Sequence, residues 1–304
     1  GGMSGSILGD VTNNGLLRFA RSDAATFAGV ILGSGAVETR SGVLILTADS
    51  TYSGGTTIGT GATLQLGNGG ASGLIAGDVV NNGTLRFARS DAATMAGAIS
   101  GSGGLQVQSG SLILTGNSSY TGATTIAAGA TLQLGNGGGV GSMTSDVANA
   151  GTFAFNGAGA LAYGGVISGN GLIRQIGSGV TSLTGDASGF TGATQVEAGV
   201  LSVNGKLGGT VTVLAGGQLQ GIGTVGDVIV VGTIAPGNSI GTLAVGNITF
   251  QAGSIYQVEV TANGQSDRIV AAGTATINGG SVQVLAGQGS YQPNTTYTIL
   301  TAAG

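Results

Sequence analysis

The stretch Asp10-Val11-Thr12-Asn13-Asn14-Gly15 returns as Asp78-Val79-Val80-Asn81-Asn82-Gly83, and Ala62-Thr63-Leu64-Gln65-Leu66-Gly67-Asn68-Gly69-Gly70 returns unchanged as residues 130–138. Residues 10–70 align without a gap with residues 78–138, at an offset of 68, and 43 of the 61 aligned positions are identical. A degenerate third copy begins at Asp146 and ends near Gly205. A fixed internal period of this kind predicts a solenoid, in which each copy packs on the next.

Short alternating segments lie between clusters of Gly, Asn and Ser inside each copy. Examples are Leu44-Ile45-Leu46, Leu64-Gln65-Leu66 and Leu85-Arg86-Phe87. Alternation with period two, flanked by turn residues, predicts half-buried strands. From 44 to 64, 85 and 112, equivalent segments follow at steps of 20, 21 and 27 residues, which together make the 68-residue period. We therefore predict three coils per copy of a right-handed parallel β-helix, with equivalent side chains stacked on one another.

Composition supports a folded all-β chain. Of 304 residues, 65 are Gly and two are Pro, only 7 % are charged, and Cys, His and Trp are absent. The richness in Val, Ile, Thr and Leu favours β-structure over disorder. A net charge of −4 with eight scattered cations argues against nucleic acid as a partner. The start Gly1-Gly2-Met3 lacks the pattern of a signal peptide, so we expect a piece of a longer array.

The substitutions between copies separate candidate core residues from surface residues. Six apolar positions are identical in the first two copies and are predicted to point inward: Leu44, Leu46, Tyr52, Ile58, Leu64 and Leu66, with counterparts Leu112, Leu114, Tyr120, Ile126, Leu132 and Leu134. Variable positions, such as Glu38 with its counterpart Gln106, are predicted to face solvent. A close-packed interior tolerates little change, which explains the difference.

The pattern changes at Lys206, where turn-rich stretches and then longer strands begin. We predict β-helix repeats over residues 1–205, with copies at about 1–68, 69–136 and 137–205, and a C-terminal β capping module over residues 206–304. The terminal coil of a solenoid has to be covered, since its open edge would otherwise promote aggregation.

Two sets of motifs resemble the passenger domain of a monomeric, type V autotransporter of Gram-negative bacteria. The repeats resemble the passenger-associated transport repeat through Gly42-Val43-Leu44-Ile45-Leu46-Thr47, Thr51-Tyr52-Ser53-Gly54-Gly55-Thr56-Thr57-Ile58 and Gly61-Ala62-Thr63-Leu64-Gln65-Leu66-Gly67. The end of the chain resembles the autochaperone or junction region of that family through Pro236-Gly237-Asn238-Ser239-Ile240-Gly241, Gly264-Gln265-Ser266-Asp267-Arg268-Ile269 and Tyr297-Thr298-Ile299-Leu300.

The resemblance implies export through the periplasm and outer membrane, folding from the C-terminal module, and display at the cell surface or release. It also implies two partners: the chain's own outer-membrane β-barrel translocator, expected outside this chain, and either a host-cell or matrix receptor or another copy of the protein. The leading hypothesis is a non-enzymatic adhesin or stalk. The alternatives are self-association between cells and a carbohydrate-active β-helix lyase or hydrolase.

The candidate functional residues are those of the junction motifs, to which the resemblance assigns a role in folding: Pro236, Gly237, Asn238, Ser239, Ile240, Gly241, Asp267, Arg268 and Tyr297. We predict no catalytic, cofactor-binding or metal-binding residue. Without His, a Ser-His-Asp triad is impossible. Gly221-Ile222-Gly223-Thr224-Val225-Gly226 matches the dinucleotide fingerprint, but a strand follows it where the fingerprint needs a helix.

The repeated sequence Arg18-Phe19-Ala20-Arg21-Ser22-Asp23, with its counterpart at residues 86–91, has two interpretations. It could display cations for an anionic glycan, with the two copies three coils, or roughly 14 Å, apart. The favoured interpretation is a coil corner with Arg–Asp pairs in solvent, where each pair contributes little stability.

Overall fold

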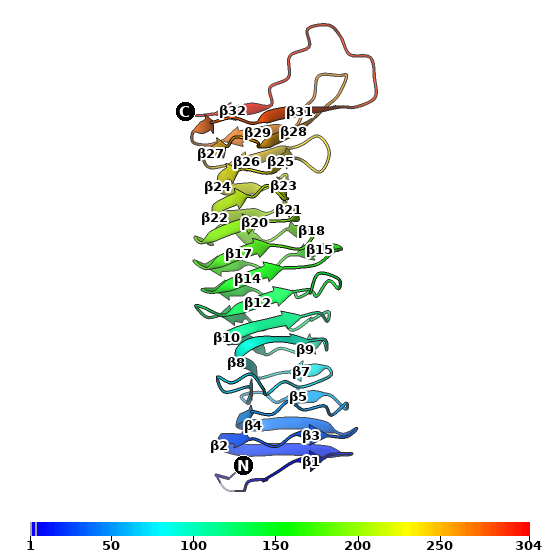
Figure 1. Ribbon diagram of the computed structural model, residues 1–304, viewed down its shortest axis with the longest axis vertical. Coiled ribbons are helices and arrows are strands. Elements are labelled where there is room, and N and C mark those ends of the chain that lie inside the picture. The colour runs from blue at the N-terminus through cyan, green and yellow to red at the C-terminus, as the bar shows by residue number, and fades with distance from the viewer. Residues whose placement is uncertain (1, 4) are drawn as a thin grey trace. The chain divides into compact units, whose positions relative to one another are not determined.

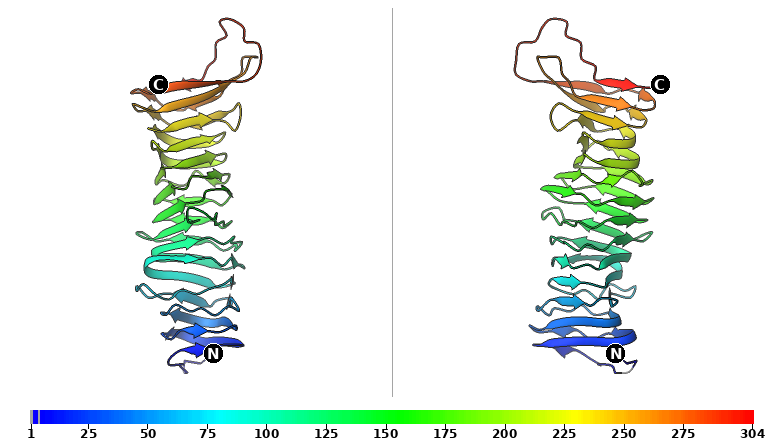
Figure 2. Two further views of the ribbon diagram at one scale, coloured as in Figure 1. Left: turned by 45° about the vertical axis from the view of Figure 1, so that its right-hand side comes forward. Right: turned by 180° about the vertical axis from the view of Figure 1, so that it is seen from behind.

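The chain folds entirely through β-strands. The computed structural model describes residues 2–3 and 5–304, and every regular element among them is a strand. The chain divides into two compact units, Gly1–Ala154 and Phe155–Gly304. Within each unit the strands stack in parallel as successive coils (Figure 1). The views of Figure 2 show the same stacking from two further sides. The predicted fold class, an all-β parallel β-helix, is confirmed.

The N-terminal unit has three faces. The first contains the starts of β2 (Leu16–Phe27) and β4 (Ala36–Leu46), then β5 (Thr56–Ile58), β7 (Val79–Asn81) and β9 (Ile99–Ser100). The second contains the ends of β2 and β4, then β6 (Thr63–Leu66), the starts of β8 (Thr84–Met95) and β10 (Gly104–Leu114), β11 (Thr124–Ile126) and β13 (Val147–Asn149). The third contains the ends of β8 and β10, then β12 (Thr131–Leu134) and β14 (Thr152–Phe155), while β1 (Val11–Thr12) pairs separately with β3 (Ile31–Leu32).

Long strands turn a corner between two faces without ending. β4 and β10 each carry a Ser-Gly pair at the bend, and Gly42 and Gly110 have φ values of 69° and 71°. A side chain at Gly42 would also approach the carbonyl oxygens of Arg21 and Asp23 to 2.5 Å. Glycine is therefore required at this corner for both its backbone angle and its small size.

Columns of apolar side chains fill the interior. In the N-terminal unit, Leu44, Leu64, Leu85 and Leu105 pair in register on consecutive coils, and none is more than 2 % exposed. All twelve side chains predicted to point inward because they are identical between copies are buried. Each buried leucine of this kind contributes about 2 kcal/mol through the hydrophobic effect.

The sequence repeat does not contain a whole number of coils, so the prediction of three coils per copy is wrong. Three coils lead from Leu44 through Leu64 and Leu85 to Leu105, which is 61 residues. The remaining seven residues of the 68-residue period carry the chain round a corner to Leu112, which pairs with Leu132 and lies on the third face. Equivalent residues of successive copies therefore lie on different faces and do not stack.

The C-terminal unit is wound in the same way. One face is a seven-stranded sheet of β15 (Ala160–Tyr163), β18 (Val180–Leu183), β21 (Gly199–Val203), β23 (Gly217–Gly221), β25 (Thr233–Pro236), β28 (Ile255–Val260) and β31 (Ser281–Ala286). A second has β16 (Ile167–Gly169), β19 (Asp186–Ala187), the starts of β22 (Lys206–Val213) and β24 (Thr224–Val230), β26 (Thr242–Val245), β29 (Arg268–Ala271) and β32 (Leu300–Ala302). The third has β17 (Leu172–Gln175), β20 (Ala193–Val196), the ends of β22 and β24, β27 (Ile248–Phe250) and β30 (Ala275–Ile277).

Strand pairing is continuous across residue 206, where the sequence suggested that a capping module begins. β22 pairs with β20 on one side and with β24 on the other. The glycine-rich residues 221–226 lead directly into β24, so the strand expected after that motif is present. Residues 287–299, between β31 and β32, form a long loop that projects from the coils of this unit (Figure 1).

Candidate functional site

The loop from Pro236 to Gly241 connects β25 to β26 and is tied to three other coil segments of the C-terminal unit. Gly237, with φ of 95°, exchanges backbone hydrogen bonds with Gly221, at 2.8 and 3.3 Å. The side-chain amide of Asn238 donates a hydrogen bond of 2.9 Å to Asn204 Oδ1. The loop therefore packs back on earlier coils and does not project into solvent.

Asp267 lies beneath this loop and is only 2 % exposed. Its Oδ1 accepts the amide of Gly241 at 2.8 Å, and its Oδ2 accepts the amide of Glu259 at 2.8 Å. Burial raises the pKa of the Asp267 carboxyl, and the two amide donors partly oppose that rise. Because both oxygens are engaged, the carboxylate fixes the path of the loop and has no free oxygen to act as a general base.

The structure brings some of the predicted residues together and separates others. Gly241 and Asp267 are in direct contact, as the order of the motifs suggested. Arg268 follows Asp267, but its side chain is exposed, and only its backbone bonds to the motif, through the amide donating to Gly241 O at 2.9 Å. The hydroxyl of Tyr297 donates to Thr261 O at 2.7 Å, at the base of the long loop.

A cleft of about 170 Å³ lies beside the Pro236–Gly241 loop. Amide side chains dominate its lining, which consists of Gln218, Gln220, Ala235, Pro236, Gly237, Asn238, Ser239, Gln257, Glu259 and Asp267. The glutamines face outward from β23 and β28, and nothing in the repeat pattern distinguished them from ordinary surface residues. Asn204, which holds Asn238, was likewise not identified from the sequence.

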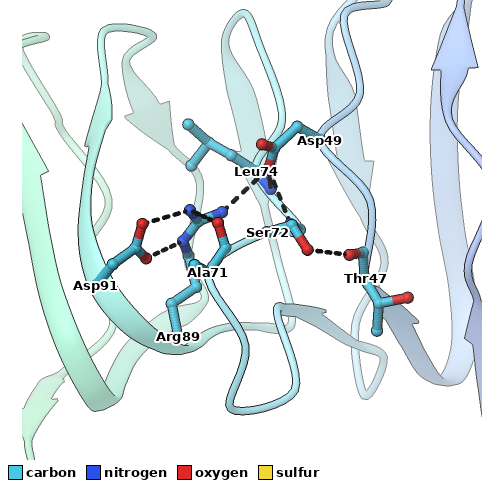
Figure 3. Close-up of polar contacts among 8 residues, drawn as sticks. Thr47, Asp49, Ala71, Ser72, Leu74, Arg89 and Asp91 are labelled. Carbon is cyan, nitrogen blue, oxygen red and sulfur yellow. Dashed lines mark hydrogen bonds and ion pairs between the residues drawn. The ribbon is translucent and has the colours of Figure 1, made fainter.

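The densest polar cluster of the N-terminal unit is centred on Arg89 (Figure 3). Its guanidinium bonds to both oxygens of Asp91, at 2.9 and 3.0 Å, to Asp49 Oδ1 at 3.0 Å and to Ala71 O at 2.5 Å. Arg89 is 4 % exposed, although the sequence suggested that such pairs lie in solvent. The corner position and the Arg–Asp pairing were correctly expected, whereas the burial was not.

Asp49 connects this cluster to the glycine-rich loop between β6 and β7. Its Oδ1 accepts the amides of Gly73 at 2.9 Å and Leu74 at 2.8 Å, in addition to Arg89. The hydrogen bond from Leu74 is the main reason that the pKa of Asp49 lies below its ordinary value, and Arg89 adds to the effect. In the first copy Arg21 plays the corresponding part, bonding to Asp23 and to the carbonyls of Met3 and Gly5. These contacts hold a loop in place.

Within residues 2–3 and 5–304, no group of three or more His, Cys, Asp and Glu residues is arranged to hold a metal ion. The described part of the chain also contains no helix that is long and apolar enough to cross a membrane. The acidic groups are instead distributed among individual contacts, of which Asp267 and Asp49 are the most connected.

Three segments of the chain match the passenger-associated transport repeat: residues 41–66, 106–134 and 173–203. The chain is also similar to the adhesin BmaC autotransporter of Brucella suis biovar 1 (strain 1330), with 34 % identity over 174 residues, which is 50 % of this chain and 5 % of that protein. It is similar to an extracellular serine protease of Serratia marcescens as well, with 48 % identity over 71 residues, which is 22 % of this chain and 7 % of the protease. The matched regions thus span only a small part of either relative.

These similarities agree with the fold. The matched segments coincide with the coils that contain β4 to β6, β10 to β12 and β17 to β21. The chain is a repeat-bearing segment of an autotransporter passenger, and the comparisons support its export to the cell surface or extracellular space of Gram-negative bacteria.

Proposed function

We propose that this autotransporter passenger segment is a non-enzymatic adhesin or stalk, and that residues 206–304 promote the folding of the coils that precede them. The similarity to an adhesin supports the first part. The second part depends on one observation, the contact of buried Asp267 with both Gly241 and Glu259. This carboxylate closes successive turns of the chain within residues 241–267, so it can stabilise a first coil without help from the N-terminal repeats.

Folding of a β-helix needs such a starting point. The parallel strand pairs join residues about 20 positions apart, and closing each loop costs conformational entropy before the pairing is gained. A coil that is already closed offers a paired edge and a layer of apolar side chains to the next segment. Growth from the C-terminal unit toward the N-terminus would then proceed coil by coil.

The folding role can be tested by refolding the full chain with Asp267 changed to Asn or Ala. We expect slower refolding of both variants, with the repeats delayed as well as the C-terminal unit. Asp227→Asn is the matched control, since Asp227 accepts the amide of Asn247 at 2.8 Å but is exposed. Unchanged refolding of the N-terminal unit in the Asp267 variants would show that residues 206–304 do not initiate folding.

The adhesive role is tested by the binding of the purified chain to host cells, to matrix proteins and to an immobilised copy of itself. Saturable binding to cells or matrix supports an adhesin, and binding to itself supports self-association. Absence of binding to all of these surfaces supports a stalk. The chain has no His and cannot by itself supply the Ser-His-Asp triad of a serine protease.

A further inference from the structure

One column of outward-facing side chains runs along the second face of the N-terminal unit. Strand register places six residues in it, one on each consecutive coil: Thr26, Ile45, Gln65, Arg86, Gln106 and Thr125. Neighbouring members are about 4.8 Å apart, the spacing of paired strands. Apart from Ile45, every member offers a hydroxyl, amide or guanidinium group, and Arg86 is the one that carries a charge.

Arg86 has no acidic partner. Its Nε donates to Gln106 Oε1 at 3.1 Å, and its Nη1 lies 3.5 Å from Gln65 Oε1. Among the ion pairs formed by the described residues, none includes Arg86, whereas Arg89 on the same strand is paired with both Asp49 and Asp91. A guanidinium has five N–H donors, so donors remain to bind an anion that approaches from solvent.

The first copy shows how the repeat normally satisfies this arginine. Arg18, the counterpart of Arg86, forms an ion pair of 2.7 Å with Glu38 on the next coil. The same cross-strand position is occupied by Gln106 in the second copy, so the acid is lost while the arginine is kept. The change leaves a positive charge held by two glutamine oxygens on a half-buried surface.

We propose that Arg86, flanked by Gln65 and Gln106, binds the carboxylate of an acidic polysaccharide that lies along this column. A guanidinium recognises a carboxylate through paired hydrogen bonds. The amides and hydroxyls above and below it are suited to the hydroxyl groups of the neighbouring sugars. The extended, regularly spaced column favours a polymer of sugars over a compact ligand. This assignment rests on the proposed adhesive function and names its ligand class.

The test measures retention of the full chain on immobilised polygalacturonate, with neutral dextran as the control polymer. We expect the wild-type chain to be retained on polygalacturonate alone and to elute with salt, because the contact is ionic. Arg86→Gln should weaken binding about tenfold, the loss of one charge-assisted contact. Gln106→Glu should weaken it as strongly, since it installs the pair that Arg18 has.

Two variants keep the test specific. Arg18→Gln removes a cation of the same type from the first copy and should leave binding unchanged. Glu38→Gln releases Arg18 from its acid and should strengthen binding, by creating a second site of the same kind. Circular dichroism and thermal unfolding confirm that each variant is folded.

Equal retention of wild type, Arg86→Gln and Gln106→Glu would overturn the proposal, as would retention on poly-glutamate in place of polygalacturonate, which would indicate an acidic peptide ligand. Cell binding separates this result from the adhesive function. If Arg86→Gln adheres to cells like wild type and polygalacturonate is not bound, the ligand assignment fails while adhesion stands. If polygalacturonate binding depends on Arg86 but no cell is bound, adhesion fails instead.

Discussion

The backbone amide of Gly241 donates a 2.8 Å hydrogen bond to the carboxylate of Asp267, 26 residues further along the chain. The other oxygen of this carboxylate accepts the amide of Glu259. One buried side chain therefore satisfies two backbone donors that would otherwise lack partners, and it joins the loop after β25 to the turn before β29.

Asp267→Ala should lower the free energy of unfolding by about 3 kcal/mol, because two buried amides lose their acceptor. Asp267→Asn should cost less, since one oxygen remains to accept a bond. Denaturant titration of the C-terminal unit measures the change. Asp186→Ala, at an exposed acid paired with Lys206, is the control and should have a smaller effect. Equal effects of the Asp267 and Asp186 variants would argue against the importance of the buried contact.

The pH dependence of stability should have opposite signs at two acids. Burial raises the pKa of Asp267, so its folded state binds the proton more tightly, and its contribution to stability is lost as pH rises through the folded pKa. The pKa of Asp49 is lowered, so its contribution is lost as pH falls below the ordinary value of about 4. Unfolding of wild type, Asp267→Asn and Asp49→Asn between pH 3 and pH 7 should show the two trends, and parallel curves for all three proteins would contradict them.

The contacts of Arg89 should control the order of the loop between β6 and β7. Arg89→Gln leaves Asp49 and the carbonyl of Ala71 without their cation, which should cost about 2 kcal/mol, reduced by the solvent around the two acids. Amide hydrogen exchange at Gly73 and Leu74 should speed up, because Asp49 holds both amides. Arg86→Gln, at an exposed arginine on the same strand, should leave exchange at these amides unchanged. Protection that survives in Arg89→Gln would mean that Asp49 holds the loop alone.

The coil register can be tested with engineered cysteine pairs, since the chain has no Cys of its own. Arg86 and Gln106 are directly paired, so Arg86→Cys with Gln106→Cys should form a disulfide. Stacking of equivalent repeat positions would instead place residue 113 beside residue 86. Ile113 pairs with Thr94, so Arg86→Cys with Ile113→Cys should remain reduced. The opposite result would restore the arrangement of three coils per repeat.

Much of the fold was predictable because it is encoded locally. Alternation around Leu44, Leu64 and Leu85 specifies strands, and identity between copies specifies which side chains are buried. The contact of Asp267 with Gly241 was not predictable from spacing. The isolated charge of Arg86 could not be identified without knowing that Gln106, and not Ile113, lies beside it.

The sequence by itself determined that this chain is a β-solenoid with an apolar interior, because side-chain period and turn residues act over a few positions. Only the tertiary structure decided which face each copy occupies. Lateral pairing depends on how many residues are used at every corner, and those lengths accumulate along the chain until seven residues of each repeat move the next copy to a new face. Residues that match in the repeat, such as Arg18 and Arg86, thereby acquire different neighbours.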